Sequence, residues 1–194
     1  MMAIFQGSVL EDAHAVIARY PAGGERSALM PLLYLAQAVD GRLTPEALVE
    51  VGGLLHITTA EVEAVATFYS MYRLRPTGTH VVAICTNLAC ALRGAKEVYE
   101  EAHRASGMEH GQEVSEDGLL TLHEEECLGV CDFAPAVQVN FANHDNVSTE
   151  RMRELISVLQ NGSVPEPARG PAMRSFRHAS RVLAGFDDAD EGAQ

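Results

Sequence analysis

The stretch HVVAICTNLACALRG, residues 80–94, runs from apolar residues directly into two cysteines and sets the class of fold expected for this chain. Its first six residues are apolar and β-rich, which predicts a buried strand. Residues 91–106 then predict a helix, which Ser106-Gly107 ends. Downstream, two more strands and a last helix are predicted at 119–123, at 136–141 and from Ser148 to Gln160. This order predicts a small sheet with helices packed on it.

The residues before this stretch predict helices. Thr44 followed by Pro45 is a good helix start, and Thr58 with Glu61 fits a capping box. The expected helices run from Ser8, as N-cap, to Arg19, from Glu25 to Val39, onward from Pro45, and from Thr58 to Tyr72.

The last of these helices carries the aromatic stretch ATFYSMYRL, residues 66–74. Val65, Phe68 and Tyr72 share one helix face, which predicts core positions. Tyr69 or Met71 is left for a surface that meets a partner.

The composition changes again after Asn161-Gly162. Residues 163–186 hold four arginines and a single acid, Glu166, together with apolar anchors such as Phe176. A basic, partly apolar arm on an acidic protein predicts contact with a partner, and a mobile tail is the alternative.

The fold class expected from these patterns is α+β, with three parts. Residues 1–76 form a helical bundle, residues 77–160 a thioredoxin-like α/β domain, and residues 161–194 an extended C-terminal arm with a flexible end.

Composition limits the kind of partner. The 194 residues are 47% hydrophobic and 21% charged, with a formal net charge of -13. Such a charge argues against nucleic acid, because phosphate binding needs clustered Lys and Arg. No apolar stretch reaches the ~20 residues of a membrane-spanning helix, so direct membrane insertion is not expected. The N-terminus resembles neither a secretory signal nor a transit peptide, and an intracellular, reducing location is expected.

Four cysteines form the principal candidate site, in two close pairs: Cys85, Cys90, Cys127 and Cys131. Each pair is predicted on a loop beside a strand, and neighbouring strands can bring such loops together. A [2Fe-2S] cluster needs four thiolates, and structural zinc also accepts four cysteines. Two disulfides are disfavoured in a reducing compartment, and a redox dithiol would want Cys-x-x-Cys, which is absent. Spacing favours the cluster over zinc and leaves both open.

The neighbours of the cysteines favour anionic sulfur. Cys90 is predicted at the start of a helix, where backbone N–H groups stabilise a thiolate. Gly129 permits backbone to approach sulfur, and Arg93 and Thr86 are candidate additional donors.

An acidic run precedes Cys127. Glu124, Glu125 and Glu126 would lower a cluster's reduction potential if close, although an ordinary solvated face is the favoured interpretation. His123 before them invites a mixed Cys/His site, but four cysteines already complete a ligand set. Neither a Walker loop nor a G-x-G-x-x-G motif occurs, so the sequence predicts an electron carrier or a structural metal module.

The segments VATFYSMYRLRPTGTHVVAICTNLACALRGA and ECLGVCDFAPAVQVN closely resemble a known family. They are similar to the thioredoxin-like two-iron ferredoxin subunits of respiratory complex I, which are the E subunits of NADH:quinone oxidoreductase. The resemblance runs from about Ser27 to Leu159. It implies that Cys85, Cys90, Cys127 and Cys131 hold one [2Fe-2S] cluster.

The resemblance also implies partners and a location. The cluster would exchange an electron with FMN on an adjacent NADH-binding subunit, and the large iron-sulfur subunit of the peripheral arm would be a second neighbour. The complex would lie at the cytoplasmic face of the inner membrane. Related modules serve NAD-linked hydrogenases and formate dehydrogenases, and these remain alternatives.

One departure from the family pattern concerns the residues after the last cysteine. Many members have a small or polar pair there, whereas this chain has Asp132-Phe133. Asp132 would shift the cluster's potential downward, and Phe133 would shield it from water. The resemblance to thioredoxin-like folds also predicts a cis peptide bond at Ala134-Pro135.

Overall fold

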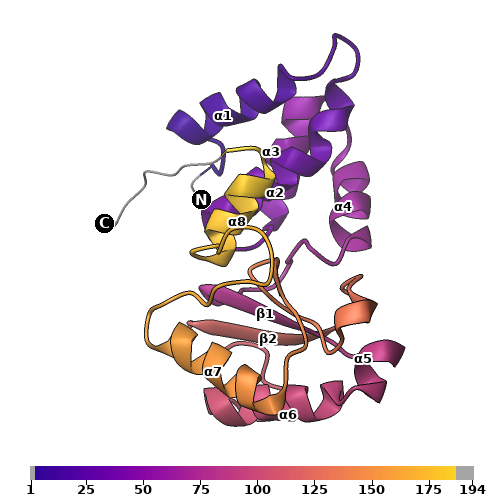
Figure 1. Cartoon of the computed structure of the whole chain (residues 1–194). Coiled ribbons are helices and arrows are strands. Elements are labelled where there is room, and N and C mark those ends of the chain that lie inside the picture. Colours follow the sequence, from indigo (N-terminus) through magenta and orange to yellow (C-terminus); the bar gives the residue numbers. More distant parts are fainter. Residues whose placement is uncertain (1–2, 187–194) are drawn as a thin grey trace. The chain divides into compact units, whose positions relative to one another are not determined.

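The computed structural model describes residues 3–186 and divides the chain into two compact units (Figure 1). The helical unit contains the chain up to Pro76 and the chain from Arg177 onward. The sheet unit is Thr77–Phe176. The chain therefore enters the sheet unit once and returns to the helical unit near its C-terminal end. The predicted flexible end falls in residues 187–194, outside the described residues.

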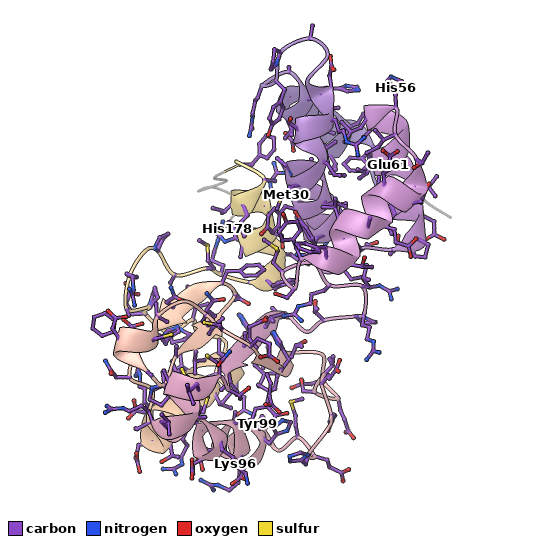
Figure 2. The ribbon with its side chains drawn as sticks, turned by 90° about the vertical axis from the view of Figure 1, so that its right-hand side faces the viewer. Met30, His56, Glu61, Lys96, Tyr99 and His178 are labelled. Atoms are coloured by element: carbon purple, nitrogen blue, oxygen red, sulfur yellow. The ribbon has the colours of Figure 1, made fainter. Side chains whose placement is uncertain are left out.

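The helical unit is built from α1 (Gly7–Ile17), a 3-10 turn η1 (Glu25–Ala28), α2 (Leu29–Asp40), α3 (Pro45–Leu55) and α4 (Thr59–Phe68). The predicted start of α3 is confirmed, because the Thr44 side chain accepts a hydrogen bond from the N–H of Ala47 at 3.2 Å. The capping box at Thr58 and Glu61 is also confirmed, and Figure 2 labels Glu61 on the helical unit. Each cap satisfies backbone donors that a helix start leaves free.

Two predictions for the helical unit are wrong. Gln6, and not Ser8, is the N-cap of α1, with no side-chain capping bond. The helix α4 ends at Phe68 because Tyr69 has extended backbone angles. Phe68 and Tyr72 therefore do not share a helix face as predicted. Phe68 is 77% exposed, whereas Tyr72 is buried. Phe68 lies edge-on against Tyr69, with ring centroids 4.9 Å apart.

Most of the last helix, α8 (Phe176–Leu183), belongs to the helical unit. The buried amide of Gln37 donates to Ser180 Oγ at 3.1 Å, and Arg181 pairs with Asp12 at 2.8 Å. Arg19 donates to the carbonyl of Ala184. In the described residues, this part of the C-terminal segment therefore packs within the helical unit, and a partner-binding role for residues 161–194 stays a prediction.

The segment before α8, residues 163–175, is called the strap here, and it belongs to the sheet unit. Ala168 N–H donates to the carbonyl of Asn143 at 2.7 Å, and Asn140 Nδ2 donates to the carbonyl of Met173 at 3.0 Å. At the end of the strap, the fully buried Phe176 packs on Phe141. These contacts hold the strap against β4 and the turn that precedes it.

The sheet has the order β2-β1-β3-β4. Its strands are β1 (His80–Cys85), β2 (Leu120–Glu125), β3 (Val137–Val139) and β4 (Ala142–His144). β1 pairs in parallel with β2, and the other neighbours are antiparallel. The sequence predicted three strands, and β4 was missed because Asn140 and Phe141 turn the chain in a tight hairpin with positive φ.

Helices α6 (Ala95–Ser106) and α7 (Thr149–Gln160) pack together, and a shared core joins them to the sheet. The predicted N-cap of α7 is confirmed, since Ser148 accepts from the N–H of Arg151. The single helix predicted at 91–106 is instead two, because Gly94 adopts a left-handed conformation between α5 (Leu88–Leu92) and α6. No helix among the described residues is long and apolar enough to cross a membrane.

Candidate metal centre

The four cysteines lie at one end of the sheet. Cys85 is the last residue of β1 and lies opposite Glu125, the last residue of β2. The chain continues past Glu125 directly to Cys127. On the other side of β1, the N–H of Cys85 donates to the carbonyl of Ala136 at 3.1 Å, just before β3. The predicted convergence of the two cysteine loops is therefore confirmed by the register of these strands.

The thiols are arranged as two pairs. Cys85 interacts with Cys90, and Cys127 with Cys131, while Cys131 also raises the pKa of Cys90 and Cys85 that of Cys131. The inner pair is buried, with 2% of each residue exposed, and the outer pair is exposed. All four are free thiols. Within residues 3–186, no three Cys, His, Asp or Glu side chains are grouped to hold a single metal ion.

Neighbouring thiols make it harder for Cys90 and Cys131 to lose their protons. Burial raises the pKa of Cys90 to about 11, and the neighbouring Cys85 adds to the rise. The pKa of Cys131 is raised mainly by Cys127, with smaller contributions from burial, Cys85 and Asp132. A cationic group bound between the thiols would remove this penalty, because it stabilises thiolates.

The loop between the outer cysteines presents a backbone donor to sulfur. Gly129 has φ +74, and its N–H donates to Cys127 Sγ at 3.4 Å. A hydrogen bond of this kind stabilises a thiolate ligand and is one of the means by which proteins tune iron-sulfur clusters. Cys85 Sγ in turn contacts the carbonyl of Glu126 at 3.7 Å. The predicted approach of backbone to sulfur at Gly129 is present.

Other predicted neighbours contribute less. Cys90 lies inside α5, a helix of five residues, so a long helix dipole does not act on it. In the part of the chain that the structure describes, no hydrogen bond joins the side chains of Arg93 or Thr86 to a cysteine sulfur. His123 faces Glu125 on β2, at 3.5 Å.

The acidic run before Cys127 is mostly exposed to solvent. Glu124 and Glu126 are exposed, while Glu125 is partly buried. The favoured interpretation of the run, a solvated face, agrees with this exposure. The predicted cis peptide bond at Ala134-Pro135 is confirmed, directly before β3.

Sequence reasoning missed two features around the cysteines. Leu88 and Leu92, four residues apart on α5, are 71% and 79% exposed, although Cys90 between them is buried. The second feature is a contact between the strap and the residues after Cys131: Arg169 lies over the ring of Phe133. The exposed leucines could have been found from their i, i+4 spacing around a buried cysteine, whereas a contact 36 residues apart leaves no sequence signal.

The fold and the four thiols define a class: thioredoxin-like domains that hold an iron-sulfur group at one end of the sheet. A comparison with family descriptions supports this class, since residues 13–160 match the thioredoxin-like [2Fe-2S] ferredoxin family. The chain belongs to this family.

Its relatives narrow the family further. The E subunit of the NADH-quinone oxidoreductase of Mycobacterium tuberculosis (strain H37Rv) is 44% identical over 183 residues, which cover 93% of this chain and 71% of that protein. NADH-quinone oxidoreductase subunit 2 of Thermus thermophilus is 39% identical over 146 residues, covering 75% and 80% of the two chains. The expected resemblance to the E subunits of these oxidoreductases is thus confirmed.

A solved structure supports the fold. A chain of an NAD⁺-reducing [NiFe]-hydrogenase in the H₂-reduced state superposes with a TM-score of 0.61 at 23% identity, over 71% of this chain. This chain spans only 22% of the length of that hydrogenase chain.

The donor set fits the group that the family binds. A [2Fe-2S] cluster takes thiolate ligands, two for each iron, and the structure offers four thiols as two pairs beside a sulfur-directed N–H. The cofactor of this chain is a [2Fe-2S] cluster, as the resemblance to the family implied.

Proposed function

We propose that Cys85, Cys90, Cys127 and Cys131 are the ligands of this cluster and that the chain transfers single electrons as the E subunit of an NADH:quinone oxidoreductase. The observation that carries the proposal is the convergence of two thiol pairs at one end of the sheet. The cluster supplies a one-electron redox centre when bound. The chain supplies the thiolates, the Gly129 N–H and a buried inner wall.

The exposed half of the site supports electron transfer with a partner. Cys127 and Cys131 lie at the surface, so a partner can approach the outer edge of a bound group. Leu88 and Leu92 add an exposed apolar face on α5 beside the site. Large exposed apolar side chains commonly mark contacts between proteins. The partner in this proposal is the FMN- and NADH-binding subunit, and the electron passes between its flavin and the cluster.

The proposal extends to the assembly and its location. The chain would lie in a peripheral arm that includes a large iron-sulfur subunit, at the cytoplasmic face of the inner membrane. The names of the relatives, which are subunits of NADH-quinone oxidoreductases, support membership in a complex with partner subunits. A second candidate is the equivalent subunit of an NAD-linked hydrogenase or formate dehydrogenase, which the fold match to the hydrogenase chain favours.

Purification of the tagged chain from its own cells would separate these candidates. We expect it to retain a flavin-containing subunit, and we expect NADH to reduce the cluster in that preparation. Quinone-reductase subunits in the same preparation would support the first candidate, and a hydrogenase or formate dehydrogenase large subunit the second. A chain that is purified with neither, and whose cluster does not respond to NADH with the flavin subunit added, would contradict both.

A further inference from the structure

The residues directly after Cys131 form a short turn, η2 (Cys131–Phe133), whose last ring is partly exposed. Phe133 is 40% exposed. Its carbonyl accepts a hydrogen bond from the N–H of Asn146 at 2.8 Å. The chain between β4 and α7 therefore lies against this turn and supports it from one side.

The strap supports the same turn from outside. The guanidinium carbon of Arg169 lies 5.3 Å from the centre of the Phe133 ring, a cation–π contact. Arg169 also forms an ion pair with Asp145, the residue that precedes Asn146. Arg169 thus bridges the ring that follows Cys131 and the segment that holds this ring's backbone.

The position of Arg169 is fixed by the strap. The preceding residue, Ala168, donates its N–H to the carbonyl of Asn143 on β4, at 2.7 Å. The Asp145 side chain is only 15% exposed, whereas that of Arg169 is 46% exposed. A carboxylate with little exposure holds a cation more firmly than a surface carboxylate does, because water screens the pair less.

One side of this contact lies outside the part of the chain that matches the family. The match ends at residue 160, so it includes Phe133 and Asp145 but not Arg169. The cation is therefore supplied by the C-terminal segment.

We propose that Arg169 is a positioning residue for the cluster: it clamps the turn after Cys131 and, with Asp145, sets the charge beside that ligand. This inference rests on the proposed ligand set. A guanidinium beside the turn favours the added electron and so raises the reduction potential, whereas Asp145 acts in the opposite sense. Asp132, next to Cys131, opposes Arg169 as well.

The test is the midpoint potential of the cluster, measured by redox titration followed by EPR on the full-length purified protein. Arg169→Gln removes the cation, and we expect a negative shift of the midpoint. Asp145→Asn removes the anion, and we expect a positive shift. Arg169→Lys keeps the charge, and we expect a midpoint closer to that of the wild type than the Gln variant gives.

A matched control is available on α7. Arg151 ion-pairs with Glu154, and its side chain is 44% exposed, almost as much as that of Arg169. Arg151→Gln removes the same charge from an equally exposed arginine in a more exposed pair, and we expect a smaller shift than Arg169→Gln produces. The visible spectrum of each variant reports whether the cluster is retained.

Opposite shifts in Arg169→Gln and Asp145→Asn would support the inference, since simple loosening of the turn would move both variants in one direction. Shifts of the same sign, or an Arg169→Gln shift no larger than that of Arg151→Gln, would overturn it and leave the proposed function intact. A wild-type protein without a [2Fe-2S] signal would overturn both.

Discussion

The four cysteines of the proposed site differ most in their exposure. Cys85 ends a strand whose residues are all buried, and Cys90 packs in a buried cluster with Cys85 and three alanines. Cys127 and Cys131 lie on an exposed loop whose glycine directs an N–H at sulfur. The inner pair gives a bound cluster a dry wall, and the outer pair gives it an edge that a partner can reach.

A buried histidine predicts how the protein responds to acid. His144 on β4 is 4% exposed, and burial, together with the charge of Arg151, lowers its pKa to about 4. The unfolded chain, with an ordinary value near 6.5, binds the proton more readily. The stability that the neutral, buried His144 contributes is therefore complete above about pH 6.5 and is lost as the pH falls towards 4.

We expect the free energy of unfolding to fall by about 2 kcal/mol from about pH 7.5 to pH 5, because the pKa of His144 is lowered in the folded state. Urea unfolding at the two pH values, followed by circular dichroism, would measure the loss. The variant His144→Gln cannot take up this proton, so its pH dependence should be smaller. An equal pH dependence in both proteins would show that His144 is not the group responsible.

At the site, the sequence predicted some residues and missed others. The cysteines and Gly129 were identified from spacing, because ligand chemistry limits the residue types that a cluster accepts. Arg169 and Asp145 were not identified, because neither residue type is unusual at a surface. Only the folded path of the strap brings them to Phe133.

Among the elements, the backbone just before β1 lies unusually close to the backbone at the start of β2. Gly78 lies just before the strand, and its N–H donates to Thr121 Oγ1 at 2.7 Å. A Cβ added there would lie 2.7 Å from the carbonyl carbon of Leu120. Backbone cannot move aside as a flexible side chain can, so the strand would have to shift.

We expect Gly78→Ala to lower the unfolding free energy by about 2 kcal/mol or more, as overpacking does. Gly53→Ala is the control, because a Cβ at Gly53, within α3, meets nothing within 4 Å. That variant should be unchanged or slightly more stable, since alanine favours helix over glycine by about 1 kcal/mol. Equal stabilities for the two variants in denaturant would contradict the close approach at Gly78.

The helix α5 leads to a prediction about partner binding. Replacing both Leu88 and Leu92 with Ser should leave the cluster spectrum unchanged, because these side chains point away from the buried Cys90. The affinity for the flavin-containing subunit should fall about tenfold, equivalent to about 1.4 kcal/mol.

Val49→Ser is the matched control for this pair, since Val49 is an exposed apolar side chain on α3, in the other unit. Quantitative pull-down with the purified flavin subunit would compare the variants. Normal binding by the leucine variant would show that α5 is not part of the contact.

The elements also show what the sequence could and could not predict. The caps at Thr44, Thr58 and Ser148 and the strand β1 followed from local patterns, because hydrogen bonds within a few residues decide them. The strand β4 was missed, since a three-residue strand after a tight turn has too few residues to show alternation. The early end of α4 was missed because helical spacing continues past Phe68 although the backbone does not.

Over its full length, the chain returns to its helical unit after completing the sheet unit. The returning helix α8 fills that unit with the fully buried Ala179 and Ser180. The sequence predicted an arm for a partner, because composition reports basic and apolar character but not which surface those residues cover. The buried amide of Gln37 depends on this return for its bond to Ser180.

A chain ending at Phe176 should therefore keep its cluster but lose stability in the helical unit. We expect a loss on the order of 3 kcal/mol, from an exposed core and from the loss of one of the two hydrogen bonds that the buried Gln37 amide nitrogen donates. A chain ending at Phe186 is the control, because it keeps α8, and it should unfold at a higher denaturant concentration than the chain ending at Phe176. If the two truncated chains unfold at the same denaturant concentration, α8 does not stabilise the helical unit.

The assignment of one cluster to four cysteines is best tested by chemical analysis of the anaerobically purified protein for iron, sulfide and zinc, with EPR after dithionite reduction. We expect about two irons and two sulfides per chain, as a [2Fe-2S] cluster requires. We also expect Cys127→Ser to lose most of the visible spectrum, whereas Asp132→Asn keeps it. One zinc without sulfide, or an unchanged spectrum in Cys127→Ser, would show that these four cysteines do not hold the cluster.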